Sequence, residues 1–257
     1  MSGAQLLVHQ VRYEQKSFWR NPVAAVFIVA FPLMFLFIFA SMSGTVDAYH
    51  GISQAQYVVP QMLSYGLMNA CFTNPAINLT YRRESGLLKR LRLTPLPRWA
   101  ALGGIVGNAL VTAVLVGGVI LVIGFAGYGI HWYGHVLALL VAVAVGVLAF
   151  AALGAAVSTF IPNEDAAPPV VNFAYIGLLF LSGNFIPISP GSVLARIGDI
   201  FPVRHLDTAV ISTFLPGGPH GPAHGFSWPD IGVLAIWGVA GALVAVRRWR
   251  WEPRRSG

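Results

Sequence analysis

Uncharged runs divide the sequence into membrane-length segments. No Asp, Glu, Lys or Arg occurs in residues 21–46, 48–81, 99–163, 166–195 and 231–246. A helix needs about 20 apolar residues to cross the hydrocarbon core of a bilayer, and the third run is long enough to cross it twice. Residues 127–132, Gly-Tyr-Gly-Ile-His-Trp, predict a turn between these two crossings. The pattern therefore predicts an all-α, polytopic membrane protein with six transmembrane helices at 22–43, 57–79, 101–126, 136–160, 167–188 and 229–247.

Basic residues flank the uncharged runs unevenly. Of the 16 Lys and Arg residues, 14 fall in the segments 12–20, 82–98 and 247–255, which leaves only Arg196 and Arg204 elsewhere. Because Lys and Arg concentrate in the cytoplasmic loops of membrane proteins, we expect both termini to be cytoplasmic and the chain to lie in the plasma (inner) membrane. The long segment 189–228 is then extracytoplasmic.

Composition supports this reading and excludes other classes. Of the 257 residues, 56% are hydrophobic and 10% are charged, whereas a soluble domain carries about 25% charged residues. The net charge of +7 could suggest nucleic-acid binding, but basic clusters beside long apolar runs are typical of membrane flanks. We therefore expect membrane lipid, and no nucleic acid, beside these clusters. The single cysteine, Cys71, allows no internal disulfide.

The N-terminal segment 1–21 has amphipathic character. Leu7, Val11 and Phe18 recur at helical spacing, with basic residues between them. This spacing predicts a short helix in the inner membrane interface. It is equally compatible with a plain membrane anchor.

The loop at 80–99 also predicts an amphipathic helix. Leu87, Leu88 and Leu91 fall on one helical face, and Thr94-Pro95 ends the helix. Such a helix can lie on anionic lipid or dock into a groove of a cytosolic partner. The physical pattern leaves both uses open.

This loop contains an ordered motif. Its residues are Arg83, Glu84, Gly86, Leu87, Leu88, Leu91, Thr94 and Pro95. In order and spacing they resemble the Arg-Glu-x-Gly-(Thr/Leu)-Leu-x-x-Leu-x-x-(Thr/Ser)-Pro pattern that follows the second span of type-2 ABC transporter permeases, the membrane subunits of daunorubicin-resistance-type drug exporters and of lipid and polysaccharide exporters. The resemblance implies that 84–95 is the coupling helix that contacts an ATPase subunit.

A second motif lies near the end of the fifth predicted span. Its residues are Ser182, Gly183, Phe185, Pro187 and, further on, Pro202. They are similar to a Ser-Gly-x-x-(Phe/Ile)-Pro-(Ile/Leu) turn and a later Phe-Pro in the same permeases. The resemblance implies short re-entrant helices at 183–215 on the outer side, where irregular backbone must pack on protein or line a wet cavity. No role is assigned to the Gly-, Pro- and His-rich residues 215–228.

The resemblance also implies the partners. It implies two copies of a separate ABC ATPase, which bind ATP and Mg, and a second permease chain in a homodimer or a heterodimer. The chain itself cannot form a phosphate-binding P-loop, which needs Gly-Lys-Ser or Gly-Lys-Thr, because Gln15 precedes Lys16 and Leu88 precedes Lys89. We expect a transport subunit that binds no cofactor and has no catalytic residue of its own.

Polar residues inside the predicted second and fifth spans form a candidate translocation path. They are Gln61, Tyr65, Asn69, Thr73, Asn74, Asn78, Asn172, Tyr175 and Ser182. The first four recur every four residues, so they lie along one face of a helix and are expected to face another helix or a cavity rather than lipid. Hydrogen bonding between helices, with no contact to a substrate, is the alternative for each of them.

Other functions have weaker support. No Asp or Glu stands at the centre of a predicted span, which counts against a proton-coupled carrier, although a secondary carrier or channel without an ATPase remains the alternative. The histidine pairs 131/135 and 220/224 have no Cys or carboxylate cluster beside them, so no metal site is expected. The substrate is expected to be amphipathic or hydrophobic, a drug, lipid or glycolipid, and the resemblance favours multidrug efflux and antibiotic resistance. No residue selects one compound.

Overall fold

The computed structural model describes residues 3–20, 22–41, 45–46, 52–86, 97–132, 134–182, 192–215 and 225–248. Several predictions fall on other residues. The coupling residues Leu87, Leu88, Leu91, Thr94 and Pro95 and the turn residues Gly183, Phe185 and Pro187 lie outside the described residues, as do residues 216–224.

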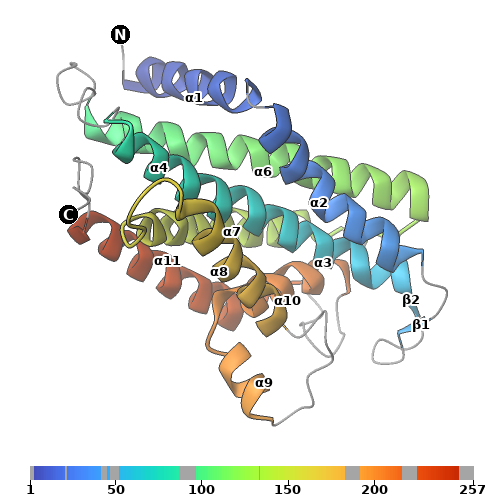
Figure 1. Cartoon of the computed structure of the whole chain (residues 1–257). Helices are drawn as coiled ribbons and strands as arrows, with labels where there is room; N and C mark the ends of the chain where they lie inside the picture. The colour runs from blue at the N-terminus through green and yellow to red at the C-terminus, as the bar shows by residue number, and fades with distance from the viewer. Residues whose placement is uncertain are drawn as a thin grey trace.

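Helices make up almost all of the described secondary structure (Figure 1). In chain order they are α1 (Gly3–Trp19), α2 (Pro22–Ala40), α3 (Gln54–Met68), the π-helix η2 (Asn69–Thr73), α4 (Asn74–Glu84), α6 (Arg98–Tyr128), α7 (Val136–Ser158), α8 (Ala167–Leu181), α9 (Val193–Gly198), α10 (Pro202–Phe214) and α11 (Trp228–Arg248). Two strands of two residues each, β1 (Thr45–Val46) and β2 (Ile52–Ser53), pair antiparallel between α2 and α3. Apart from this strand pair, the all-α prediction is confirmed.

Among the described residues, three helices are long and apolar enough to cross a membrane. They are Gly103–Tyr128 within α6, then Val136–Ser158 and Trp228–Arg248. These helices match the predicted spans 101–126, 136–160 and 229–247 and identify a membrane protein. Helices α2 and α8 are apolar but shorter, so the six-span count stays a prediction.

The turn between α6 and α7 lies where the sequence pattern placed it. Helix α6 ends at Tyr128, and Gly129 follows with a φ of 63° in the left-handed region. This conformation is accessible to glycine and is a common way to end a helix. Gln56 at the start of α3 exchanges two hydrogen bonds with the backbone of His131 in this turn, at 2.9 and 2.7 Å. These bonds fix α3 against the end of α6.

One long helical segment, residues 54–84, runs through the centre of the bundle. It corresponds to the predicted span 57–79, but it is not a uniform α-helix, since η2 interrupts it at Asn69–Thr73. A π-turn inserts one extra residue, so it rotates the residues before it relative to those after it. The turn is accommodated by α7, where Gly154 lets the carbonyl of Phe72 approach closely.

The apolar face of the N-terminal helix α1 packs on α6 of the same chain. Leu7 packs on Gly103 and Val11 on Gly107, and a Cβ atom at either glycine would collide with the facing side chain. Further along, Gln15 donates a hydrogen bond of 3.1 Å to the backbone oxygen of Asn108. Helix α1 therefore lies lengthwise on the first half of α6 (Figure 1), and its predicted place in the membrane interface stays a prediction.

On the other side of the bundle, α7 and α11 pack closely along their length. Gly238 and Gly241 of α11 face the backbone of Ala149 and Leu153 of α7, and small residues permit such close approach of helices in membrane proteins. The short helix α10 packs against α3, α11 and α7, and α9 packs against α8 (Figure 1). Short helices in 183–215 were predicted from the resemblance, and their depth in the membrane is a separate prediction.

Candidate functional site

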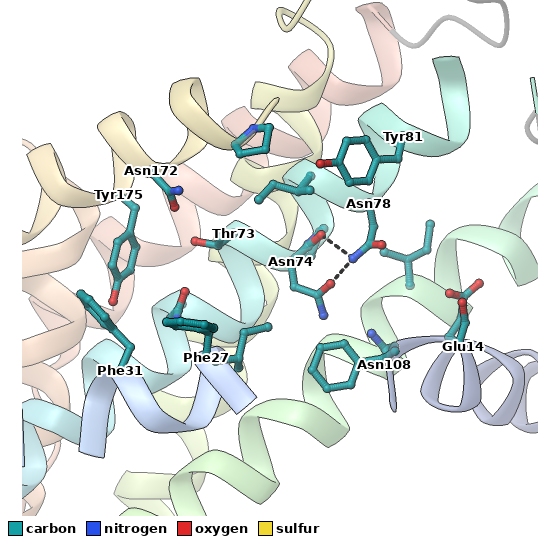
Figure 2. Close-up of a pocket in the computed structure, with 18 of the residues that line it drawn as sticks. Glu14, Phe27, Phe31, Thr73, Asn74, Asn78, Tyr81, Asn108, Asn172 and Tyr175 are labelled. Carbon is teal, nitrogen blue, oxygen red and sulfur yellow. Dashed lines mark hydrogen bonds between the residues drawn. The ribbon is translucent and has the colours of Figure 1, made fainter. Parts of the chain in front are cut away.

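A cavity of about 600 Å³ lies between α1, α2, η2, α4, α6 and α8. Six of the nine residues predicted for a translocation path line it: Asn69, Thr73, Asn74, Asn78, Asn172 and Tyr175 (Figure 2). They come from one stretch of the long central helix and from one face of α8, which approach each other in space. We refer to this cavity as the polar pocket.

The polar pocket contains polar atoms without a hydrogen-bond partner in the described structure. They are Thr73 Oγ1, Asn74 Nδ2, Asn108 Oδ1 and the hydroxyl of Tyr175. The side chains of Asn74, Asn108 and Tyr175 are at least nine-tenths buried. Because buried polar groups in proteins are almost always hydrogen-bonded, these four buried atoms beside the pocket call for a partner, such as a water or a ligand group, that the described residues do not supply.

An ion pair closes one end of the pocket. Arg82 of α4 donates to both carboxylate oxygens of Glu14 of α1, at 2.6 Å for the Nη1–Oε1 bond. Gln10 also donates to Glu14, at 3.0 Å. Bidentate arginine–carboxylate contacts are strong and fix the geometry of both side chains. Among the described residues, Glu14 and Arg82 are the only charged ones that line the pocket, and they neutralise each other.

Aromatic side chains form the opposite walls. Phe27 and Phe31 of α2 line the pocket, and the Phe31 ring meets the ring of Tyr175 edge-on with centroids 6.2 Å apart. Phe27 is 65% exposed and Ile176 of α8 is 46% exposed. The pocket is thus bordered by an apolar surface on the side where α2 and α8 approach each other.

Three predicted path residues do not line the polar pocket. The hydroxyl of Tyr65 lies 2.9 Å from the hydroxyl of Ser182 and joins α3 to the end of α8. Gln61 is buried in α3. Gln61 and Tyr65 both precede the π-helix, whereas Asn69 and Thr73, its first and last residues, line the pocket.

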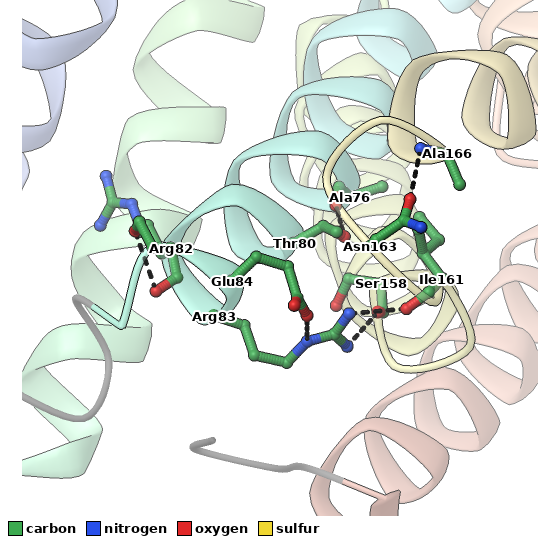
Figure 3. A network of polar contacts seen from close by, with 10 residues as sticks. Ala76, Thr80, Arg82, Arg83, Glu84, Ser158, Ile161, Asn163 and Ala166 are labelled. Atoms are coloured by element: carbon green, nitrogen blue, oxygen red, sulfur yellow. Dashed lines mark hydrogen bonds and ion pairs between the residues drawn. The ribbon is translucent and has the colours of Figure 1, made fainter. Parts of the chain in front are cut away.

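The first residues of the coupling motif make internal contacts (Figure 3). The Arg83 side chain is buried and donates to the backbone oxygens of Ser158 and Ile161, at 2.9 and 2.6 Å, and to Glu84 at 2.7 Å. The last carbonyls of a helix lack intrahelical donors, so this guanidinium caps the end of α7. Gly86 has a φ of 70° just after α4 ends. Contact of the segment with an ATPase stays a prediction.

A separate polar cluster joins α10 to α11. The two ring nitrogens of His205 lie 2.5 Å from a carboxylate oxygen of Asp230 and 2.8 Å from the backbone oxygen of Asp199, and Ser227 donates to the other oxygen of Asp230. The hydrogen bond to Asp230 raises the pKa of His205, although burial opposes it. Pro202, predicted for the outer turn, occupies the first turn of α10, a favourable place for proline.

The sequence pattern did not indicate several of these groups. Asn108 lies in a long apolar run where Thr112 is the nearest other polar residue. Glu14 and Arg82 are 68 positions apart, so no local period links them. Asp207 lies in the segment predicted to be extracytoplasmic, yet it is fully enclosed and hydrogen-bonded to Ser64 of α3. No group of three or more metal-binding side chains occurs among the residues that the structure describes.

The long apolar helices define a helical membrane protein, and the polar pocket gives it an internal cavity between α1, α2, η2, α4, α6 and α8. The ABC-2 type transporter family model matches residues 5–215 of the chain, so the chain belongs to this family. No curated protein matches it. Membership identifies the membrane component of an ABC-2 transporter, a permease subunit that works with an ATP-binding subunit.

Proposed function

We propose that the chain is the permease of an ABC exporter that moves an amphipathic or hydrophobic substrate, such as a drug, lipid or glycolipid, out of the cytoplasm. Two copies of a separate ATPase subunit supply the energy and bind ATP and Mg. A second permease chain, identical or related, completes the complex in the plasma membrane. Multidrug efflux and antibiotic resistance are the physiological roles to test first.

The proposal is carried by one observation: a single helical segment both lines the polar pocket and leads into the coupling motif. Asn69, Asn74 and Asn78 line the polar pocket from residues 54–84, and the same segment ends at Glu84, where the predicted coupling helix begins. A displacement of 84–95 by an ATPase would therefore reach the pocket through a single rigid element. Such a connection is what alternating access requires.

The topology proposed with this function has six spans and both termini in the cytoplasm. Helices α6, α7 and α11 supply three spans. Helices α2 and α8 and the long segment 54–84 supply the others, and α9 and α10 form the outer re-entrant part. The basic segments then lie inside, as the positive-inside rule requires.

The test is to introduce charge on the apolar face of the coupling segment. Leu88→Glu and Leu91→Glu should abolish co-purification with the ABC ATPase and ATP-driven export of a fluorescent amphiphile from proteoliposomes, because a carboxylate cannot enter an apolar groove at low cost. Leu88→Met, which keeps the apolar surface, is the matched control. Export that persists in both glutamate variants would contradict the proposal. Transport by the purified chain without an ATPase would favour the secondary carrier or channel.

A further inference from the structure

We propose that the polar pocket binds the uncharged, hydroxyl-rich head of an amphipathic substrate and discriminates against charged heads. This inference rests on the proposed function, because it takes the polar pocket to be the substrate site. It names the chemistry of the head, which neither the family nor the sequence pattern specifies.

The four partnerless atoms of the pocket demand a ligand that both donates and accepts. Asn74 Nδ2 can only donate, Asn108 Oδ1 can only accept, and the hydroxyls of Thr73 and Tyr175 can do either. A hydroxyl on the ligand satisfies each of them. A primary ammonium group can only donate, a quaternary ammonium group can neither donate nor accept, and a sulfate or carboxylate can only accept, so each leaves at least one buried protein atom unsatisfied.

The charges that line the pocket also disfavour an ionic head. Arg82 is held by both oxygens of Glu14, and Gln10 occupies Glu14 further. A charged head has no free countercharge among the pocket-lining residues, so it must either break this pair or remain uncompensated. Both cost free energy, because breaking a buried pair exposes a lone charge to a medium of low polarity.

The apolar walls provide a place for the rest of an amphiphile. Phe27, Phe31 and Ile176 line the pocket from α2 and α8, Phe27 and Ile176 are exposed, and the Phe31 ring meets that of Tyr175. An acyl or alkyl chain that follows this wall keeps its head on the asparagine side. The arrangement matches an amphiphile that enters from the apolar phase, head inward.

The experiment measures binding to the full chain in phospholipid nanodiscs, with three probes that share a dodecyl tail. Below its critical micelle concentration, dodecyl maltoside should bind at least ~10-fold more tightly than dodecyl sulfate or dodecyltrimethylammonium, after subtraction of binding to empty nanodiscs; tenfold corresponds to about 1.4 kcal/mol. Equal or tighter binding of either charged probe would overturn the proposal. This comparison uses the unaltered chain, so it does not depend on whether any variant folds.

Two conservative variants then locate the head. Tyr175→Phe and Thr73→Val each remove one hydroxyl, and each should weaken maltoside binding about 3- to 10-fold, as expected for one hydrogen bond. Thr80→Val is the matched control, since the Thr80 hydroxyl bonds within α4 to Ala76 and lies outside the pocket. If the folded pocket variants bind maltoside as tightly as the Thr80 variant does, the assignment is wrong.

The outcome is separable from that of the proposed function, because no ATPase takes part in the binding measurement. A chain that pairs with an ABC ATPase but binds all three probes alike overturns only the head assignment. A chain that selects the maltoside head but needs no ATPase for transport overturns only the exporter.

Discussion

The two halves of the central segment 54–84 have different relations to their polar groups. Before the π-turn, Gln56 and Tyr65 pair with His131 and Ser182, although Gln61 Nε2 has no partner in the described structure. At the end of the turn and just after it, Thr73 and Asn74 each leave a buried polar atom without a partner beside the polar pocket. Both halves hold neighbouring helices, but the partnerless atoms that border the pocket come from the turn and from the second half. Similar residue types on one helix are therefore paired or partnerless according to what lies opposite.

The largest effect is expected where the second half is anchored. Arg83→Leu should remove the cap on the end of α7 and leave Glu84 without its partner, at a cost of about 3 kcal/mol. The apparent Tm of the detergent-solubilised chain should fall by roughly 6–12 °C. Arg83→Lys keeps the charge but not the fork geometry, so it should recover only part of the loss. An unchanged Tm in Arg83→Leu would show that the cap contributes nothing.

The boundary between the halves should be the next most sensitive place. Gly154→Ala would place a Cβ atom 2.5 Å from the carbonyl oxygen of Phe72 in the π-turn. Overpacking of this kind costs about 1–3 kcal/mol, so the apparent Tm should fall by several degrees. Gly177→Ala is the control, because its Cβ would meet open space. Equal Tm values for the two variants would mean that α7 does not hold the π-turn.

Two tyrosines test the comparison directly. Tyr65→Phe removes the contact with Ser182 and should lower stability by about 0.5–1.5 kcal/mol. Tyr175→Phe removes a hydroxyl that has no hydrogen-bond partner in the described structure, so its Tm should not fall although binding of the maltoside probe weakens. Thermal denaturation of both variants, measured side by side, checks this. The reverse order of stabilities would abolish the distinction between the halves.

The smallest effect is expected at the cluster between α10 and α11, which responds to pH. The pKa of His205 is raised in the folded chain, so its stabilisation is complete below the unfolded-state pKa of about 6.5 and is lost as the pH rises through the folded-state pKa. A part-exposed pair contributes about 0–1 kcal/mol, so the apparent Tm should fall by no more than about 3 °C from pH 6 to pH 8. Asp230→Asn should reduce this fall, and a fall of the same size in that variant would exclude the pair as its cause.

The sequence predicted the parts of the fold that depend on local pattern. Uncharged runs located α6, α7 and α11, and Gly129 marked the turn after α6. The prediction of one uniform helix at 57–79 was incomplete, because a π-turn has no signature in hydrophobic period and depends on Gly154, far away in the sequence. Of the four residues at four-residue spacing, Asn69 and Thr73 line the polar pocket, and Gln61 and Tyr65 do not.

The candidate site was predicted in part for a similar reason. Polar residues on η2, α4 and α8 were visible as interruptions of apolar runs, and the pocket gathers six of them. Asn108, Glu14 and Arg82 join the pocket only through the packing of α1 and α6 on α4. Arg83 was placed in a motif whose order suggests contact with another subunit, but a sequence motif does not say which members point inward.

The ion pair between Glu14 and Arg82 also couples the positions of α1 and α4, which could otherwise change separately. Helix α1 is seated on α6, whereas Arg82 travels with α4 and with the segment that follows it. Any movement of α4 must lengthen this ion pair or displace α1 with it, and either response changes the shape of the cavity. The size of the cavity and the orientation of α4 are thus mechanically coupled, so a cross-link between residues 14 and 82 would fix both at once.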